Sequence, residues 1–175
     1  MTSIQHRLPA TLRTTRLVLA TPALGHVPAM ALLANNKRLY EVLARLPHPY
    51  CEDDGRYFVE HIARGEEEFA WAIECDGQFI GTIGLHLLPN ELPGLGYWLG
   101  EAHWGRGYAT EAARAVVDAA RAAGATALRS RALVTNTASR NVLRKLGFTE
   151  TGEGLDTTGT NAGRPTAFMR LEFER

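Results

Sequence analysis

Residues 104–111, Trp-Gly-Arg-Gly-Tyr-Ala-Thr-Glu, place two glycines directly before an alanine-rich segment. Glycine lacks a Cβ atom, so a ligand can approach the backbone closely there. The first turn of a following helix supplies N–H groups without an intrahelical partner and the positive end of the helix dipole. The spacing therefore predicts that an anion such as a diphosphate binds to the backbone of Gly105 to Thr110. A tight strand-to-helix turn without a ligand would use the same glycines.

Two common phosphate-binding motifs do not fit this segment. The dinucleotide fingerprint needs Gly or Ala at the sixth position of a motif that follows the first strand of a βαβ unit, but this chain has Thr110 there, in its second half. A P-loop needs Lys followed by Ser or Thr after the glycines, and that pair is missing. The segment must therefore be interpreted from its wider context.

The residues after the glycines have the period of an amphipathic helix that ends at Gly124. Its apolar stripe, which should pack on a flat surface, consists of Ala109, Ala113, Val116, Val117 and Ala120. Its opposite face carries charges that can pair with one another in solvent, namely Glu111, Arg114, Asp118 and Arg121.

A second cluster, residues 136–148, reads Asn-Thr-Ala-Ser-Arg-Asn-Val-Leu-Arg-Lys-Leu-Gly-Phe. Together with Tyr97-Trp98-Leu99 and the segment 104–111, it resembles the GNAT superfamily of acyl-CoA N-acyltransferases. The resemblance is closest to the RimJ/RimL-type ribosomal-protein N-terminal acetyltransferases and extends from about residue 15 to the C-terminus. The two motifs are specific in this order and separation.

The resemblance implies an α/β (α+β) GNAT fold. Its mixed central sheet would have about seven strands, splayed between the fourth and fifth strands and flanked by about four helices. Residues 1–175 would form a single N-acetyltransferase domain, with residues 1–13 as a flexible arm.

Patterning gives a coarse map of the elements. We expect helical segments within 26–46 and helices at 53–64 and 136–146. Strands are expected at 16–21, 95–100 and 128–135, with two more beginning near 148 and 168. Segments 70–74 and 79–85 flank Asp76-Gly77, a dipeptide that favours a two-residue hairpin turn. The order indicates an antiparallel first half and a βαβ unit in the second half.

Composition limits the function classes. The chain has 175 residues, 45% of them hydrophobic, which suits one compact domain. A formal net charge of +0 and a pI near 7.0 argue against broad nucleic-acid binding. The two cysteines, Cys51 and Cys75, lack the spacing of a zinc site or a disulfide framework. Without a signal-peptide or membrane-span pattern, we expect a cytoplasmic protein.

For the cofactor, the resemblance implies acetyl-CoA as cosubstrate and no metal. The diphosphate would lie on the glycine segment, and pantetheine would pair with the strand of Tyr97, Trp98 and Leu99, although the last two side chains can equally be ordinary packing. Asn136 would cap a helix and contact pantetheine. Asn141 and Arg144 would border the nucleotide or form a solvated face. The complete expected set is Trp98, Leu99, Trp104, Gly105, Arg106, Gly107, Tyr108, Ala109, Thr110, Asn136, Asn141 and Arg144.

Amide formation from a thioester needs an oxyanion donor and a route for the proton of the amine. A backbone N–H of the strand trio would donate to the thioester oxygen, so Tyr97 is counted as a catalytic candidate. The family often has Glu before Gly-Tyr-Trp, where this chain has Gly94-Leu95. His86 and Glu101 are the remaining base candidates, ahead of Glu91, and each can equally be an ordinary strand or surface residue.

The leaving thiolate needs an acid. Many GNAT enzymes use a Tyr at the position of Leu143, and here Ser139 matches the serine of the RimJ/RimL-type branch. Ser139 could instead serve only the first turn of its helix. Tyr40, Tyr50 and Tyr57 are candidate liners of an acceptor pocket in residues 39–57.

The resulting hypothesis is an acetyl-CoA-dependent N-acetyltransferase that uses direct transfer in a ternary complex. The acceptor would be a primary amine, either a protein or peptide N-terminus or a small molecule. The alternative is a noncatalytic acyl-CoA-binding regulatory module of the same fold. The sequence allows a homodimer without specifying one.

Overall fold

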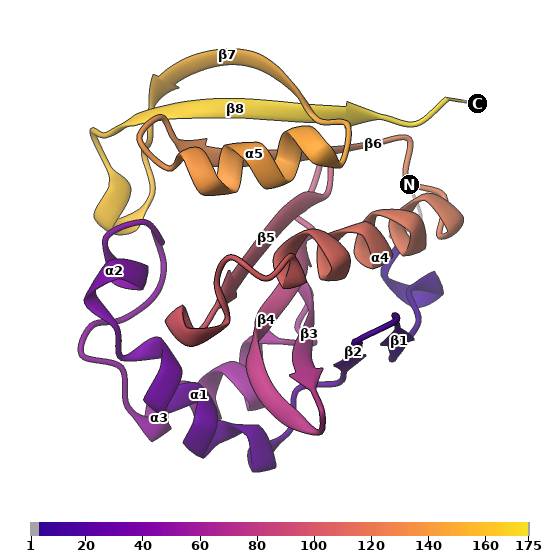
Figure 1. The fold of residues 1–175 in the computed structure, drawn as a ribbon. Helices are drawn as coiled ribbons and strands as arrows, with labels where there is room; N and C mark the ends of the chain where they lie inside the picture. The colour runs from indigo at the N-terminus through magenta and orange to yellow at the C-terminus, as the bar shows by residue number, and fades with distance from the viewer. Residues whose placement is uncertain (1–3, 175) are drawn as a thin grey trace.

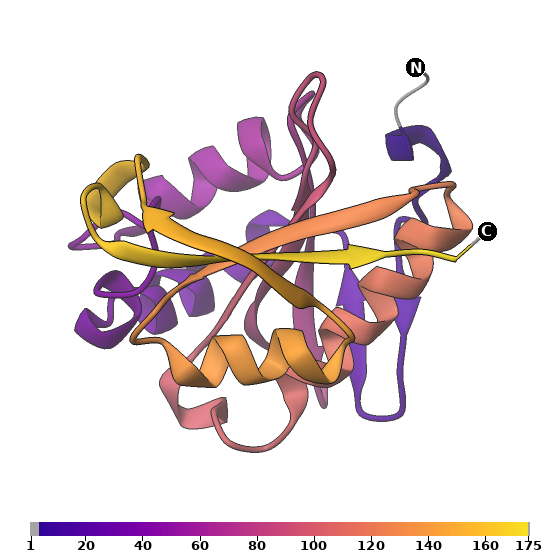
Figure 2. The same ribbon diagram turned by 90° about the horizontal axis from the view of Figure 1, so that it is seen from above.

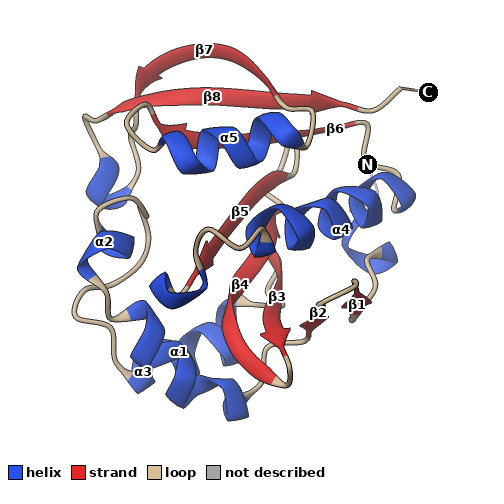
Figure 3. Cartoon of the chain, viewed as in Figure 1, coloured by secondary structure: helices blue, strands red, loops and turns tan. Residues whose placement is uncertain are grey.

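The structure is a computed structural model that describes residues 4–174 (Figure 1). Its eight strands form one mixed sheet in the order β1-β2-β3-β4-β5-β6-β8-β7 (Figure 3). The strands are β1 Leu12–Arg13, β2 Leu17–Ala20, β3 Glu68–Cys75, β4 Gln78–His86, β5 Gly94–Leu99, β6 Ala127–Leu133, β7 Thr149–Leu155 and β8 Pro165–Glu172. The α-helices are α1 Val27–Ala34, α2 Lys37–Tyr40, α3 Glu52–Tyr57, α4 Tyr108–Ala122 and α5 Thr137–Lys145. Short turns of helix are η1 Ile4–Arg7, η2 Leu24–His26, η3 Phe58–Ile62, η4 Glu101–His103 and η5 Gly159–Asn161.

The topology confirms the expected mixture of pairings. Strands β1 to β5 are antiparallel neighbours, and β5 and β6, joined through α4, form the parallel pair. The hairpin between β3 and β4 turns at Asp76 and Gly77, whose φ values of 50° and 74° suit a type I′ turn. The sheet has eight strands instead of about seven because residues 12–13 add the edge strand β1. The splay lies between β5 and β6, the fourth and fifth strands when β1 is not counted.

The two faces of the sheet are covered by different helices. Trp71 and Ile73 of β3 point into the larger core cluster, which includes Ala113 and Val116 of α4, while the intervening Ala72 packs against the α1 side. This alternation follows from the two-residue period of a strand. Figure 2 shows α4 and α5 on the same side of the sheet, with α3 on the opposite side.

The apolar stripe predicted for α4 is confirmed. Its fully buried positions include Ala113, Val116 and Ala120, and Val117 is 5% exposed. The charged side chains of α4 were expected to pair with one another in solvent. Instead, Glu111 pairs with Arg16, and Arg121 stacks over the ring of Phe173.

The helical segments expected at 26–46 are α1 and the short α2. The chain leaves α1 after Ala34, and Asn36 then caps the short α2 by accepting a hydrogen bond of 3.1 Å from the Leu39 N–H. An asparagine that bonds the backbone in this way favours a new helix start over helix continuation. The helix expected at 53–64 is α3 followed by the π turn η3.

Residues 4–13 were expected as part of a flexible arm, but they form η1 and β1, and Leu8 is only 7% exposed. Residues 1–3 of that expected arm lie outside the described residues.

Candidate active site

Strands β5 and β6 separate soon after they meet. Their register contains one pair, Gly94 with Arg129, and the Arg129 N–H donates to the Pro93 carbonyl at 3.0 Å. β5 continues beside β4 as far as Leu99, while β6 pairs with β8 along its full length. The edge of β5 from Gly96 onward is therefore open toward β6. We call this opening the β5–β6 slot.

The backbone of β5 presents alternate residues to the slot. Gly100 N–H donates to the Ile80 carbonyl of the β4 side at 2.9 Å, whereas the Leu95 carbonyl accepts from Ser130 of β6 at 2.9 Å. Because strand groups alternate in direction, the N–H groups of Tyr97 and Leu99 point to the slot. The N–H of Trp98 points to β4.

The Trp98 side chain belongs to the packing of the opposite face. Its ring meets Phe79 edge-on at 5.9 Å between centroids, within the cluster that includes Met30. Trp98 was expected to bind the cofactor, and its side-chain contacts are those of ordinary strand packing.

The glycine loop, residues 104–107, leads directly into α4. Gly105 and Gly107 have φ values of 71° and 80°, a left-handed conformation that favours glycine. Gly107 is the N-cap and provides no side-chain hydrogen bond, and the first helical bond runs from Glu111 N–H to the Gly107 carbonyl at 3.0 Å. The N–H groups of Tyr108, Ala109 and Thr110 consequently lack an intrahelical acceptor.

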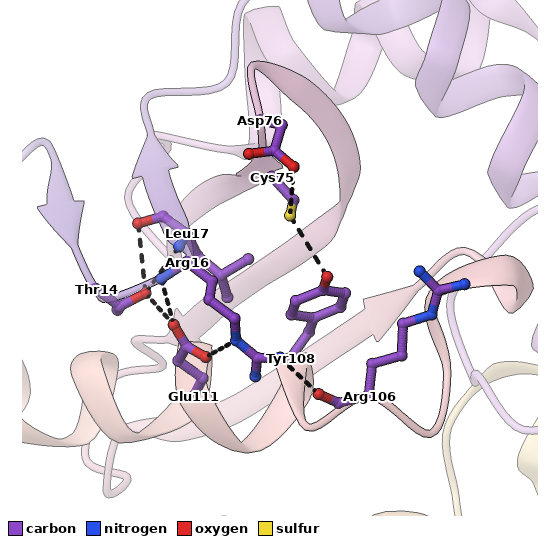
Figure 4. Close-up of polar contacts among 8 residues, drawn as sticks. All are labelled: Thr14, Arg16, Leu17, Cys75, Asp76, Arg106, Tyr108 and Glu111. Atoms are coloured by element: carbon purple, nitrogen blue, oxygen red, sulfur yellow. Dashed lines mark hydrogen bonds and ion pairs between the residues drawn. The ribbon is translucent and has the colours of Figure 1, made fainter.

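The loop is attached to both of its neighbours. The Trp104 indole N–H donates to the Leu99 carbonyl at 2.8 Å, which joins the loop to the end of β5. On the other side, Arg16 donates through Nη1 to the Arg106 carbonyl at 2.9 Å. Figure 4 shows this contact together with the ion pair between Arg16 and Glu111. Arg16 and Glu111 were not among the predicted site residues, because their pairing spans 95 positions in sequence.

A groove of about 980 Å³ adjoins the first turn of α4. Gly107 and Thr110 lie at one part of its wall. The charged residues that line other parts are the basic Arg7, Arg13, Arg114 and Lys145 and the acidic Glu111 and Asp118, so the basic side chains outnumber the carboxylates. A space of this size beside unpartnered N–H groups suits a large, negatively charged ligand.

Tyr97 and Ser139 meet across the slot. The Tyr97 hydroxyl oxygen lies 2.9 Å from Ser139 Oγ, while the Ser139 N–H donates to Oδ1 of Asn136, the α5 N-cap, at 3.2 Å. Burial raises the pKa of Tyr97, although its hydrogen bond with Ser139 acts in the opposite direction. The phenol is therefore protonated at neutral pH. The Ser139 N–H thus serves the first turn of α5, while the Ser139 hydroxyl lies against Tyr97 of β5.

The expected base candidates do not gather at one point. His86 pairs with Gly94 at the start of β5, and its Nδ1 lies 3.4 Å from Glu68 Oε2. Glu101 follows the other end of β5, whose last residue, Leu99, is about 17 Å along the strand from Gly94. Glu91 forms an ion pair with Arg129. These candidates are thus distributed along the whole strand.

Both carboxylate oxygens of Glu101 have partners on the α2 segment. Asn36 Nδ2 donates to Oε2 and Arg38 Nη1 donates to Oε1, each at 2.7 Å. The hydrogen bond from Asn36, followed by the charge of Arg38, holds the pKa of Glu101 below its ordinary value. A carboxylate in this state is a weak base.

The other expected side chains lie at the edges of the site. Arg144 of α5 is within 3.4 Å of Glu150 and 3.5 Å of Asn141, so these groups form contacts on the outer face of the helix. Tyr50 is 8% exposed in the core on the α1 side, and Tyr57 is 60% exposed. Tyr40 stacks on His48.

Among residues 4–174, no group of three or more His, Cys, Asp or Glu side chains is arranged to hold a metal ion. The same part of the chain contains no helix long and apolar enough to cross a membrane.

Comparison with known proteins defines the class. The family model described as acetyltransferase (GNAT) domain matches residues 16–149. This chain therefore belongs to the GNAT acetyltransferases, as its motifs predict. A search of curated protein sequences finds no match.

Solved structures share the fold at low identity. The microcin C7 self-immunity acetyltransferase MccE, in complex with acetyl-CoA and AMP, superposes with a TM-score of 0.83 at 18% identity, covering 95% of this chain and 98% of that one. RimL, the ribosomal L7/L12 alpha-N-protein acetyltransferase in complex with coenzyme A, superposes with a TM-score of 0.82 at 20% identity. This match covers 95% of this chain and 97% of RimL. A GNAT-family acetyltransferase from Bacillus anthracis superposes with a TM-score of 0.80 at 17% identity, covering 93% of this chain and 98% of that one.

Proposed function

We propose that this protein transfers an acetyl group from acetyl-CoA to a primary amine by direct attack in a ternary complex. The observation that carries the proposal is the open β5 edge, which ends next to a glycine loop and an uncapped helix start. An extended thioester donor with a diphosphate needs these two features side by side. The structural neighbours MccE and RimL, whose structures contain acetyl-CoA and coenzyme A, support this donor.

In the proposed complex, the N–H groups of Gly107 to Thr110 hold the diphosphate, and the basic groove beside α4 takes the nucleotide. Pantetheine amides pair with the slot edge of β5. The N–H of Tyr97 or Leu99 donates to the thioester oxygen, and this contact strengthens as negative charge develops in the tetrahedral intermediate.

The acceptor nitrogen must attack as a neutral amine, so an acceptor that arrives as an ammonium first gives one proton to a base. The nitrogen loses a second proton as the tetrahedral intermediate becomes the amide, which balances the proton taken up by the thiolate. Its lone pair forms the new C–N bond, and collapse of the tetrahedral intermediate breaks the C–S bond. We assign protonation of the departing thiolate to the Ser139 hydroxyl, with the Tyr97 hydroxyl 2.9 Å away as the next group in the proton path. Among the base candidates His86, Glu101 and Glu91, we assign removal of the amine proton to the imidazole of His86, which would act directly or through a water molecule.

The acceptor would approach from the α1–α3 side, opposite the nucleotide. RimL is described as acetylating a protein N-terminus, that of L7/L12, so peptide N-termini are the first acceptors to examine. Small amines form the second group. We place the enzyme in the cytoplasm.

The test is release of free coenzyme A from acetyl-CoA in the presence of peptides with different N-terminal residues and of small amines. Mass spectrometry of the product then shows which nitrogen gained the acetyl group. Turnover with at least one amine supports the proposal. Tight coenzyme A binding without turnover on any amine would favour a noncatalytic acyl-CoA-binding module.

A further inference from the structure

The start of α4 is connected to the β1–β2 turn by a dense set of hydrogen bonds (Figure 4). Oε1 of Glu111 accepts from the Thr14 hydroxyl at 2.7 Å and from the Arg16 N–H at 2.8 Å, and Oε2 accepts from Arg16 Nε at 2.7 Å. Burial alone would raise the pKa of Glu111, but the hydrogen bonds from Thr14 and Arg16 outweigh it and keep the pKa below its ordinary value. The carboxylate therefore remains charged and holds Arg16 in one orientation.

The same guanidinium reaches the glycine loop. Arg16 Nη1 donates to the Arg106 carbonyl at 2.9 Å, and the group lies 4.5 Å from the centroid of the Tyr108 ring. Tyr108 is itself placed by a contact of 3.6 Å between its hydroxyl and Cys75 Sγ. Arg16 thus contacts the residues on both sides of Gly107.

The direction of the Arg106 carbonyl decides the direction of the next N–H. A trans peptide is planar, so its C=O and N–H point to opposite sides. With the Arg106 carbonyl turned toward Arg16, the Gly107 N–H must point away from Arg16. Gly107 has no Cβ to resist rotation of this peptide, so another contact has to fix its orientation. A rotated peptide would present a carbonyl oxygen to the anion.

We infer that Arg16 is a positioning residue that holds the 106–107 peptide with its N–H toward the diphosphate of the donor, and that Glu111 orients Arg16 for this task. This inference rests on the proposed function. It assigns Arg16 an action through the loop backbone, in contrast to a direct bond to the ligand. Arg16, in the segment before β2, thereby acts on the diphosphate end of the donor site from outside it.

The first measurement compares the affinity for coenzyme A of the unmodified protein with that of Arg16→Ala, Arg16→Lys and Glu111→Ala by calorimetry. All three variants should bind about tenfold more weakly. Lysine keeps the positive charge, but all its donors are on one nitrogen, so it does not reproduce the separate bonds from Arg16 Nε to Glu111 and from Nη1 to the Arg106 carbonyl. Glu111→Ala removes a negative charge near the diphosphate, so charge alone would strengthen binding, whereas loss of the orienting contact weakens it.

The second measurement uses a donor without a diphosphate. The ratio kcat/KM with acetylpantetheine should be the same in Arg16→Ala and the unmodified protein, while kcat/KM with acetyl-CoA falls. Arg170→Ala is the matched control, because Arg170 is also a half-exposed arginine in an ion pair, 47% exposed against 44% for Arg16, and lies on β8. Its coenzyme A affinity should not change.

The outcomes separate the inference from the proposed function. If the unmodified protein does not bind coenzyme A, both fail. If it binds but Arg16→Ala or Arg16→Lys binds equally well, or Glu111→Ala binds more tightly, only the role of Arg16 is overturned. A parallel loss with acetylpantetheine would also overturn it, since it would indicate a general structural effect. Should Arg16→Ala not fold, Arg16→Lys and Glu111→Ala decide the question.

Discussion

The hydroxyl of Tyr97 on β5 and the hydroxyl of Ser139 in the first turn of α5 lie 2.9 Å apart, although 42 positions separate them in the chain. The contact joins the strand that would hold the thioester to the helix on the other side of the β5–β6 slot. The backbone N–H of Ser139 donates to Oδ1 of Asn136, the N-cap of α5, and this bond holds Ser139 in place. A proton delivered from Ser139 to a thiolate in the slot could be replaced from Tyr97 without movement of the backbone.

Replacing Ser139 with alanine should lower kcat at least tenfold and change KM for acetyl-CoA much less, because a proton donor to the leaving group acts mainly in the transition state. Tyr97→Phe should give a smaller loss of kcat, since water can replace the second group of the path. Steady-state kinetics with the best acceptor measures both. An unchanged kcat in Ser139→Ala, with chemistry shown to be rate-limiting, would leave Ser139 only its place in the helix turn.

Glu101→Gln should raise KM for the acceptor several-fold and leave kcat within about twofold, because its carboxylate holds Asn36 and Arg38 of the α2 segment. The acidic limb of the kcat–pH profile should stay in place, since a carboxylate with a lowered pKa is already ionised. A loss of kcat of about 100-fold would instead identify Glu101 as the general base.

The features that sequence could predict are those set by neighbouring residues. Asp76-Gly77 specifies its hairpin turn, and the stripe around Ala113 and Val116 specifies the buried face of α4. The glycine loop was predicted for the same reason, because two glycines directly precede a helix-forming segment. The family motifs added the fold and the splayed strands.

What sequence reasoning missed depends on distant contacts. The charge pattern of α4 placed Glu111 in solvent, but the β1–β2 turn covers it with Arg16, 95 positions away. Likewise, the helical segments predicted at 26–46 carried no sign of the second role of Asn36, whose side chain caps α2 and also bonds Glu101, 65 positions away. Periodicity describes one face of an element and does not identify its partner.

Tyr50→Phe should reduce the loss of stability at high pH. Burial, with smaller contributions from Asp54 and Cys51, raises the pKa of Tyr50 to about 12. A pKa that is higher in the folded state means that stability is complete below the ordinary pKa near 10 and falls as pH rises toward 12. The variant should lose less unfolding free energy over this interval, by an amount on the order of 2 kcal/mol.

Urea unfolding at a series of pH values from 9 to about 11.5 measures this difference. Tyr57→Phe is the control, because it removes the same hydroxyl group from a side chain that is 60% exposed. Identical pH slopes in the Tyr50 variant and the unmodified protein would contradict the prediction.

Gly107→Val should reduce coenzyme A affinity at least tenfold, about 1.4 kcal/mol, because a branched side chain would stand where the diphosphate must reach backbone N–H groups. Its Cβ would also lie 3.3 Å from Arg16 Nη2 and displace the guanidinium that orients the loop. The positive φ of 80° adds a folding cost of about 1–3 kcal/mol, so affinity and stability have to be separated. Gly163→Val provides that separation, since Gly163 has a φ of 79° and an added Cβ would meet nothing within 4 Å. Thermal melts should show that both variants are destabilised, whereas calorimetry should show weaker coenzyme A binding in Gly107→Val alone. Normal affinity in a folded Gly107→Val protein would refute the diphosphate site at this loop, and with it the proposed transfer from acetyl-CoA.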